Sequence, residues 1–189
     1  MSDPYLSADG RTLRNLNGIT DRAELQAYEF EMTYGRLVAL NARRLEGVYD
    51  LAHLCAFHRY IFAGIYDWAG ELRTVNIAKD SSMFASARHL ESAANSVFAQ
   101  LANEAHLGHL DRRRFVERLA FYLVEINALH PFREGNGRAQ RAFLSQLASN
   151  AGWHLDWARV SSSENLNASI AGHNGDEQPW RAILDRIVT

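Results

Sequence analysis

The chain has 189 residues, of which 47% are hydrophobic and 11% aromatic, and its formal net charge is -2. This length and apolar content predict a single domain, residues 1–189, around one core. The near-neutral charge gives no general reason to expect a nucleic acid as the main partner. No apolar run approaches the roughly 20 residues that span a bilayer, and the start, MSDPYLSADG, is polar where a signal peptide is basic and then apolar, so we expect a protein inside the cell.

Helical patterns dominate the first half of the chain. Apolar residues repeat at helical spacing from Asp21 to Leu45, and a second helix is predicted from about Asp50 to Phe62. The segment ELRTVNIAK (residues 71–79) alternates apolar and polar residues and includes β-branched ones, which predicts one short extended or hairpin segment. A further helix is predicted over residues 86–105, after turn-forming serines.

The second half contains the clearest amphipathic helix. Asp111 is a favourable N-cap, and the residues after it place one apolar stripe at Phe115, Leu119, Tyr122, Ile126 and Leu129. This helix is expected to end near His130, because Pro131 disfavours helical geometry at the residue before it. Another helix is predicted from about Gly137 to Asn150. The fold class is therefore all-α with one short β excursion.

The connection between these last two helices, HPFREGNGRAQR (residues 130–141), concentrates the chemically useful side chains. Its glycines permit close approach of a ligand to the backbone, and the first turn of the next helix offers unpaired N–H groups to an anion. Arg138 and Arg141 are three apart and can bind further phosphates. Glu134 would compete with a phosphate unless a cation such as Mg²⁺ lay between them, and His130 is a base near the site. The segment predicts phosphoryl or nucleotidyl transfer.

Each of these residues also has a structural interpretation. A single histidine at a helix end is more often structural, Arg133 and Glu134 taken alone are solvated loop charges, and arginines three apart are usually on the surface. The run DRRRFVER (residues 111–118) similarly allows a nucleic-acid or membrane binder, although a solvated helix face is the simpler interpretation. The fixed spacing of all the motif residues around one helix start favours the catalytic interpretation.

The segment 130–141 resembles the signature of the Fic family, HPFx(D/E)GNGRxxR, and matches every specified position. IFAGIYDWAGELRTVNIAKDSSMFA (residues 61–85) is similar to the family's sequence leading into its β-hairpin flap, and GWHLDW (residues 152–157) follows the signature helix as in bacterial members. The resemblance implies a Fic fold of about eight helices, with a core at about 20–150, a flap at about 71–84 and C-terminal helices at about 160–189. It also implies a protein adenylyltransferase, a nucleotidyltransferase that uses Mg²⁺ and ATP for AMPylation.

The resemblance further implies a role for each motif residue. His130 would be the general base, Phe132 a buried anchor and Glu134 the Mg²⁺ ligand. The α- and β-phosphates would lie against the backbone of Gly135, Asn136 and Gly137 and the Asn136 side chain, with help from Arg138. Arg141 would bind the γ-phosphate.

The same resemblance implies where the other substrates bind. The flap residues Lys79, Asp80, Ser81 and Ser82 would pair with an extended segment of a target protein as an added strand. Residues 165–174 are candidates to border the adenine. Doc-like kinases carry lysine at the position of Gly137, and phosphocholine-transferring members carry alanine at that of Gly135. This chain has neither, which favours nucleotidyl transfer and leaves UMP or GMP donors open.

The biological setting and the target are not determined by the sequence. Similar short bacterial chains are toxins of toxin–antitoxin pairs that modify type II topoisomerases, whereas others are secreted effectors that modify host small GTPases. The absence of an appended translocation domain favours a toxin in the bacterial cytoplasm, with secretion into a host left open. A Fic fold reduced to a binding module would have lost the base or an arginine, and both are present.

The family's inhibitory motif, (S/T)xxxE(G/N), is incomplete in this chain. Thr20 stands four residues before Glu24, but Leu25 follows, and Glu164 is preceded at that distance by Val160. We therefore expect the inhibitory glutamate to arrive on a separate, small helical antitoxin beside the helix that carries Arg141.

Overall fold

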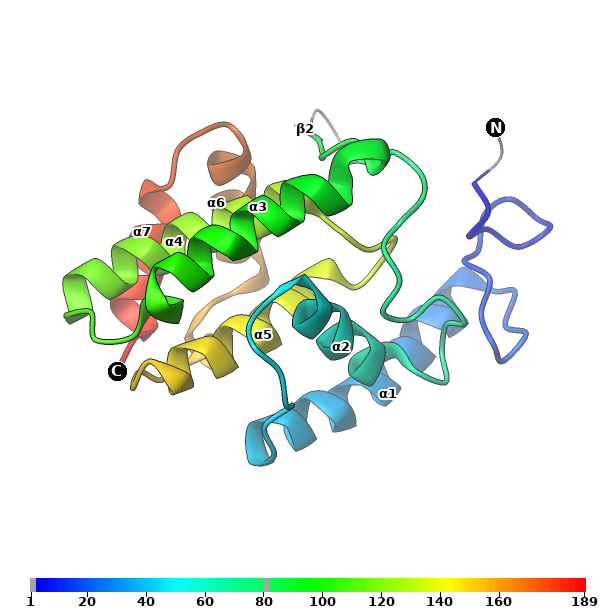
Figure 1. Ribbon diagram of the computed structural model, residues 1–189. Helices are drawn as coiled ribbons and strands as arrows, with labels where there is room; N and C mark the ends of the chain where they lie inside the picture. The colour runs from blue at the N-terminus through cyan, green and yellow to red at the C-terminus, as the bar shows by residue number, and fades with distance from the viewer. Residues whose placement is uncertain (1–2, 80–81) are drawn as a thin grey trace.

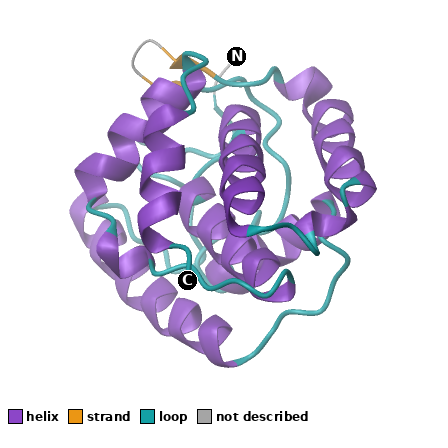
Figure 2. Cartoon of the chain, turned by 90° about the vertical axis from the view of Figure 1, so that its left-hand side faces the viewer, coloured by secondary structure: helices purple, strands orange, loops and turns teal. Residues whose placement is uncertain are grey.

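The computed structural model describes residues 3–79 and 82–189, and its regular secondary structure is almost entirely helical (Figures 1 and 2). The α-helices of this part of the chain are α1 (Arg22–Ala42), α2 (Leu51–Phe62), α3 (Leu90–Asn103), α4 (Arg112–Leu129), α5 (Asn136–Asn150), α6 (Ser162–His173) and α7 (Gln178–Ile187). Three short 3₁₀ segments are η1 (Ala87–His89), η2 (Ala105–Leu107) and η3 (Trp157–Arg159). The predicted all-α class is confirmed.

Aspartate side chains begin three of these helices, because each carboxylate accepts a hydrogen bond from a first-turn N–H group that has no partner within the helix. The pairs are Asp21 with Glu24 N–H at 2.8 Å, Asp50 with His53 N–H at 2.8 Å, and Asp111 with Arg114 N–H at 2.9 Å. The far end of α1 differs from the prediction: the helix ends at Ala42 because Arg43 is extended. The start of α5 differs by one residue, since Asn136 is already helical.

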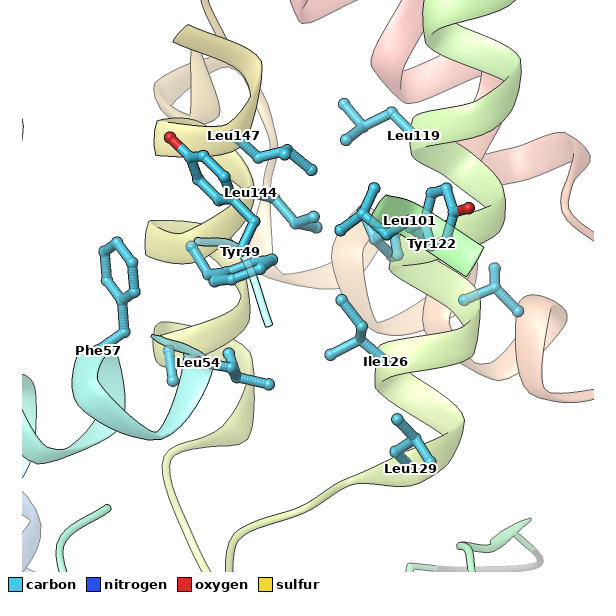
Figure 3. Close-up of a cluster of buried hydrophobic side chains, with 14 of the residues drawn as sticks. Tyr49, Leu54, Phe57, Leu101, Leu119, Tyr122, Ile126, Leu129, Leu144 and Leu147 are labelled. Carbon is cyan, nitrogen blue, oxygen red and sulfur yellow. The ribbon is translucent and has the colours of Figure 1, made fainter. Parts of the chain in front are cut away.

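The core lies where α4, α5 and α2 meet (Figure 3). Each of the five residues of the predicted α4 stripe is at most 5% exposed. Leu144 and Leu147 of α5 face this stripe, Leu54 of α2 extends toward Ile126, and Phe57 of α2 lies on the other side of α5. Because α5 is packed from two sides, its first turn is fixed relative to the end of α4.

The remaining helices cover this centre from opposite sides. α3, α6 and α7 pack against α4, and α6 and α7 also pack against each other, whereas α1 packs against α2 (Figure 1). The start of α5 therefore has α6 on one side and α1 on the other, an arrangement that shapes both cavities described below. Among the described helices, none combines the length and the apolar character needed to cross a membrane.

The predicted β excursion is short. β1 (Ala78–Lys79) pairs antiparallel with β2 (Ser82–Met83), with Ala78 opposite Met83 and Lys79 opposite Ser82. Residues 71–77 of the predicted extended segment form no strand. Asp80 and Ser81, which the sequence assigns to the target-binding flap, lie outside the described residues.

Candidate active site

The motif residues come together where α4 ends and α5 begins. His130 is the C-cap of α4 and has left-handed backbone geometry, with φ 45° and ψ 62°. Pro131 follows and prevents a further turn of helix. Gly135 is the N-cap of α5, also left-handed with φ 78°, and brings no capping side chain. The loop therefore reverses the chain between two left-handed residues and leaves the N-terminus of α5 open.

A cavity of about 470 Å³ lies above this loop, between the start of α5 and one face of α6. Its volume is in the range of small-molecule sites. The motif residues that line it are His130, Glu134, Asn136, Gly137 and Arg141, and the α6 residues that line it are Asn165, Leu166, Ser169, Ile170 and His173. The motif thus faces residues 165–174, the candidate adenine border, across one cavity.

His130 is half-buried at the edge of this cavity. Its imidazole stacks on the ring of Phe84, with centroids 3.9 Å apart and an angle of 20° between the planes. Phe84 directly follows β2 and also lies edge-on to His173, with centroids 5.7 Å apart. The short hairpin is therefore connected to the histidine through one aromatic ring.

Arg141 gives the cavity a cationic end. Burial, together with the nearby Arg138, lowers the pKa of its guanidinium below the ordinary range. Its Nη1 donates to Asn165 Oδ1 at 3.4 Å, and no carboxylate of the described chain forms an ion pair with it. Because Arg141 is partly buried without a carboxylate partner in the described chain, and the open start of α5 also favours negative charge, an anion is the fitting ligand here.

Glu134 is the carboxylate nearest to this anion site. Its Oε1 accepts the N–H of Gly135 at 2.8 Å and lies 3.6 Å from Arg138 Nη2, while the side chain is 46% exposed and lines the cavity. No group of three or more His, Cys, Asp and Glu side chains in the described residues could hold a metal ion alone. One carboxylate at the cavity fits Mg²⁺ whose other ligands are phosphate oxygens and water.

Two motif side chains are engaged within the protein. The Asn136 amide accepts the N–H of Phe132 at 2.8 Å and donates to the carbonyl of the same residue at 2.7 Å, so it shapes the loop. Arg138 does not line the cavity of His130; its Nη2 donates to Glu29 of α1 at 2.5 Å. Phe132, the predicted anchor, is 1% exposed.

Gly135 is required by packing as well as by its backbone angle. A Cβ built on it would lie 2.1 Å from the ring atom Cζ of Phe62, and its φ of 78° is unfavourable for other residues. We expect Gly135→Ala to lower the free energy of unfolding by about 2 to 4 kcal/mol, the sum of left-handed strain and overpacking. Gly152→Ala is the matched control, because Gly152 is equally left-handed but has no atom within 4 Å of its Cβ position. The Gly152→Ala variant should lose only about 1 kcal/mol of unfolding free energy. Urea titration of both variants measures the two losses, and equal losses would contradict the packing argument.

His58 is a site residue that sequence reasoning missed. It is fully buried on α2, and its ring stacks on Phe132 with centroids 3.9 Å apart. Its Nε2 lies 2.9 Å from the carbonyl of Glu134, and its Nδ1 accepts the N–H of Gly70 at 2.8 Å. The neutral imidazole thus connects the motif loop to the turn that precedes the hairpin. A histidine within an apolar helix carries no sequence signal that distinguishes this role.

Burial lowers the pKa of His58 from 6.5 to about 4, and this shift predicts a pH dependence of stability. The unfolded chain takes up the proton near pH 6.5 and the folded chain only near pH 4, so the neutral ring stabilises the fold fully above pH 6.5. As pH falls to 4, about 3 kcal/mol of unfolding free energy should be lost. Urea denaturation of the wild type and His58→Gln at several pH values measures this, and the difference between the two should shrink toward pH 4. A constant difference would contradict the assignment.

Comparison with known proteins finds relatives along the whole chain. Residues 48–148 match the model of the family described as Fic/DOC. "Protein adenylyltransferase VbhT" of Bartonella schoenbuchensis is 42% identical over 188 residues, which are 100% of this chain but 39% of that protein. "Probable protein adenylyltransferase Fic" of Salmonella typhimurium is 39% identical over 187 residues, 99% of this chain and 92% of that one.

A solved structure extends the comparison to the fold. The crystal structure of BepC from Bartonella tribocorum, with bound AMPPNP, matches with a TM-score of 0.92 at 24% identity and covers 98% of this chain and 96% of that one. The arrangement of helices around the candidate site is therefore that of BepC.

Proposed function

Because the chain belongs to the Fic/DOC family, we propose that it is a protein adenylyltransferase, which transfers AMP from ATP to a hydroxyl side chain of a target protein. The observation that carries the proposal is the pairing, in one cavity, of His130 with a partly buried arginine, Arg141, that has no carboxylate partner in the described chain. The names of the relatives at 42% and 39% identity support adenylyl transfer as the reaction.

In the proposed reaction His130 accepts the proton of the target hydroxyl. The hydroxyl oxygen then attacks the α-phosphorus, the bond from that phosphorus to the bridging oxygen of the β-phosphate breaks, and pyrophosphate leaves. Arg141 binds the γ-phosphate and so orients the α-phosphate toward the hydroxyl. Mg²⁺, bound through Glu134 and phosphate oxygens, would neutralise part of the phosphate charge.

The backbone at the start of α5 supplies the remaining phosphate contacts in this proposal. The N–H groups of Asn136 and Gly137 belong to the first turn of the helix and have no acceptor within it. Because the Asn136 amide is bonded to Phe132, we assign these contacts to N–H groups and give the side chain a supporting role. Arg138 does not contact the phosphates in this proposal, and it supports the start of α5 through its ion pair with Glu29.

The proposal also assigns the regions that bind the adenine and the target. The α6 residues that line it would border the adenine, across from the motif. The hairpin residues Lys79, Asp80, Ser81 and Ser82 would pair with an extended target segment, which places the target hydroxyl near the ring pair of Phe84 and His130.

Incubation of the purified chain with α-labelled ATP and a bacterial lysate tests the function. Label on a protein band, together with an AMP adduct on Ser, Thr or Tyr by mass spectrometry, is the expected result. Label transferred from γ-labelled ATP instead would indicate a kinase, and stronger labelling from UTP or GTP would change the donor.

We further propose that a separate small helical partner silences the enzyme in the bacterial cytoplasm. A second cavity of about 530 Å³ lies between α1 and α5, and Arg141 lines this cavity as well as the first. A glutamate arriving through it could pair with Arg141 where the γ-phosphate would bind. Phe30, Tyr34 and Val38 of α1 are 71%, 62% and 51% exposed and form an apolar stripe that could support a docked helix.

The glutamates that come nearest to an internal inhibitor have other surroundings. Glu164 pairs with Arg186 at 2.7 Å and belongs to the capping box of α6, and Glu24 lies in the first turn of α1. Expression of the chain alone should be toxic, and co-expression of a neighbouring small helical protein should relieve the toxicity. Purified chain that becomes active only after Glu24 or Glu164 is replaced would overturn this proposal.

A further inference from the structure

Arg73 is a charged side chain buried without a carboxylate partner among the described residues. It is 2% exposed and lies in the segment that leads to the hairpin. Its guanidinium donates to four main-chain carbonyls: Val75 at 2.7 Å, His130 at 2.8 Å, Leu129 at 3.1 Å, and Ala85. A guanidinium has five N–H donors in a fixed fork, and these four carbonyls take up four of them.

One side of this contact set is the end of α4. The last carbonyls of a helix have no intrahelical donor and carry the negative end of its dipole, and α4 has no basic residue in its last turn. Arg73 supplies both missing elements, since its guanidinium binds the carbonyls of Leu129 and His130. Its own backbone N–H donates to the carbonyl of Pro131 at 2.9 Å. Three successive carbonyls around the left-handed His130 are thus held by one residue.

The other side of the contact set is the base of the hairpin. Val75 and Ala85 stand before β1 and after β2, so Arg73 joins the two ends of the segment that contains both strands. Ala85 also directly follows Phe84, whose ring stacks on the imidazole of His130. The same guanidinium therefore contacts the backbone at His130 and at the residue after Phe84, the two members of that stack.

We propose that Arg73 is the positioning residue of the active site, which sets the place of the His130 imidazole relative to the hairpin that binds the target. This inference rests on the proposed function, in which His130 is the base and the hairpin binds the target. A lysine at this position keeps the charge but reaches the carbonyls from a single nitrogen, so the hairpin and the end of α4 lose their common support.

Steady-state kinetics of Arg73→Lys and Arg73→Gln, with Arg118→Lys as the matched control, test the proposal. Arg118 of α4 is a partly buried arginine whose fork binds Glu104, at 2.6 and 2.7 Å, away from the cavity of His130. Both Arg73 variants should lower kcat for AMP transfer by about 10²-fold, the cost of a misplacement of about 1 Å, with the KM for ATP unchanged. The Arg118 variant should lose thermal stability and keep its kcat.

A measurement independent of turnover separates this proposal from the proposed function. In proton NMR, the ring protons of His130 should shift in Arg73→Lys because the stack on Phe84 changes, whereas those of His53, buried on α2, should stay in place. Phe84→Leu assigns the ring-current contribution. If the wild type transfers no AMP, the proposed function fails. The change in the His130 ring-proton shift in Arg73→Lys still tests whether Arg73 positions that imidazole. An unchanged His130 resonance, parallel losses of kcat in the Arg73 and Arg118 variants, or failure of both Arg73 variants to fold would each overturn the proposal.

Discussion

Replacing His130 with alanine is expected to lower the rate of AMP transfer by about 10²- to 10⁴-fold, the usual contribution of a general base. The affinity for Mg²⁺-ATP should stay nearly the same, because the proposed phosphate contacts come from Arg141 and the start of α5. The loss should therefore fall on kcat. Single-turnover transfer from labelled ATP, with calorimetric titration of the nucleotide, measures the two quantities separately.

His173→Ala is the matched control for this prediction. His173 lines the same cavity and, like His130, contacts the ring of Phe84, but it comes from α6 rather than the motif. This variant should change nucleotide affinity and retain most of the transfer rate. If a folded His130→Ala protein instead lost ATP affinity as much as rate, His130 would be a ligand or structural residue and not the base.

Replacing Arg141 with alanine is expected to weaken ATP binding by about 10- to 100-fold and leave ADP binding nearly unchanged. A hydrogen bond to a charged group contributes about 1.5 to 3 kcal/mol, and only ATP has the γ-phosphate that this guanidinium would bind. Transfer from ATP should fall at least as strongly, because the α-phosphate loses its orientation. Calorimetric titration with both nucleotides gives the ratio of affinities directly.

Arg138→Ala provides the contrast. Arg138 pairs with Glu29, which is 8% exposed, so its removal leaves a buried carboxylate without its cation. The variant should lose about 3 to 5 kcal/mol of unfolding free energy, and its affinities for ATP and ADP should change by the same factor. If Arg141→Ala weakened both nucleotides equally, its assignment to the γ-phosphate would be wrong.

Local patterns predicted the fold well where neighbouring residues determine the structure. The aspartate caps, the stripe of α4 and the stop before Pro131 each depend on side chains within a turn or two of one another. The same locality explains why the motif could be assigned to one loop and helix start. The hairpin was less well predicted, since alternation over residues 71–79 yields only the two paired residues Ala78 and Lys79 there.

The side chains that hold the site in place make contacts between distant segments, and local sequence patterns do not predict such contacts. Arg73 and His130 are 57 residues apart, Arg138 and Glu29 are 109 apart, and His58 and Glu134 are 76 apart. Sequence patterns predict that an arginine in an alternating segment, such as Arg73, is exposed. They likewise predict that a glutamate on a charged helix, such as Glu29, is solvated. Only the tertiary structure, in which α2 packs against α5, Glu29 of α1 pairs with Arg138 and Arg73 binds the end of α4, shows that these side chains lie beside the motif.

The contacts of Phe62 bear on how this site can change during evolution. Its ring occupies the space beside Gly135, lies under the Arg138 guanidinium at 4.7 Å and stacks on His58 with centroids 4.6 Å apart. A substitution at Gly135 therefore destabilises the fold least when the side chain at position 62 becomes smaller in the same lineage. The two positions should covary across descendants of this sequence. The glycine of the motif is then constrained by the packing of position 62 on α2 as much as by nucleotide binding.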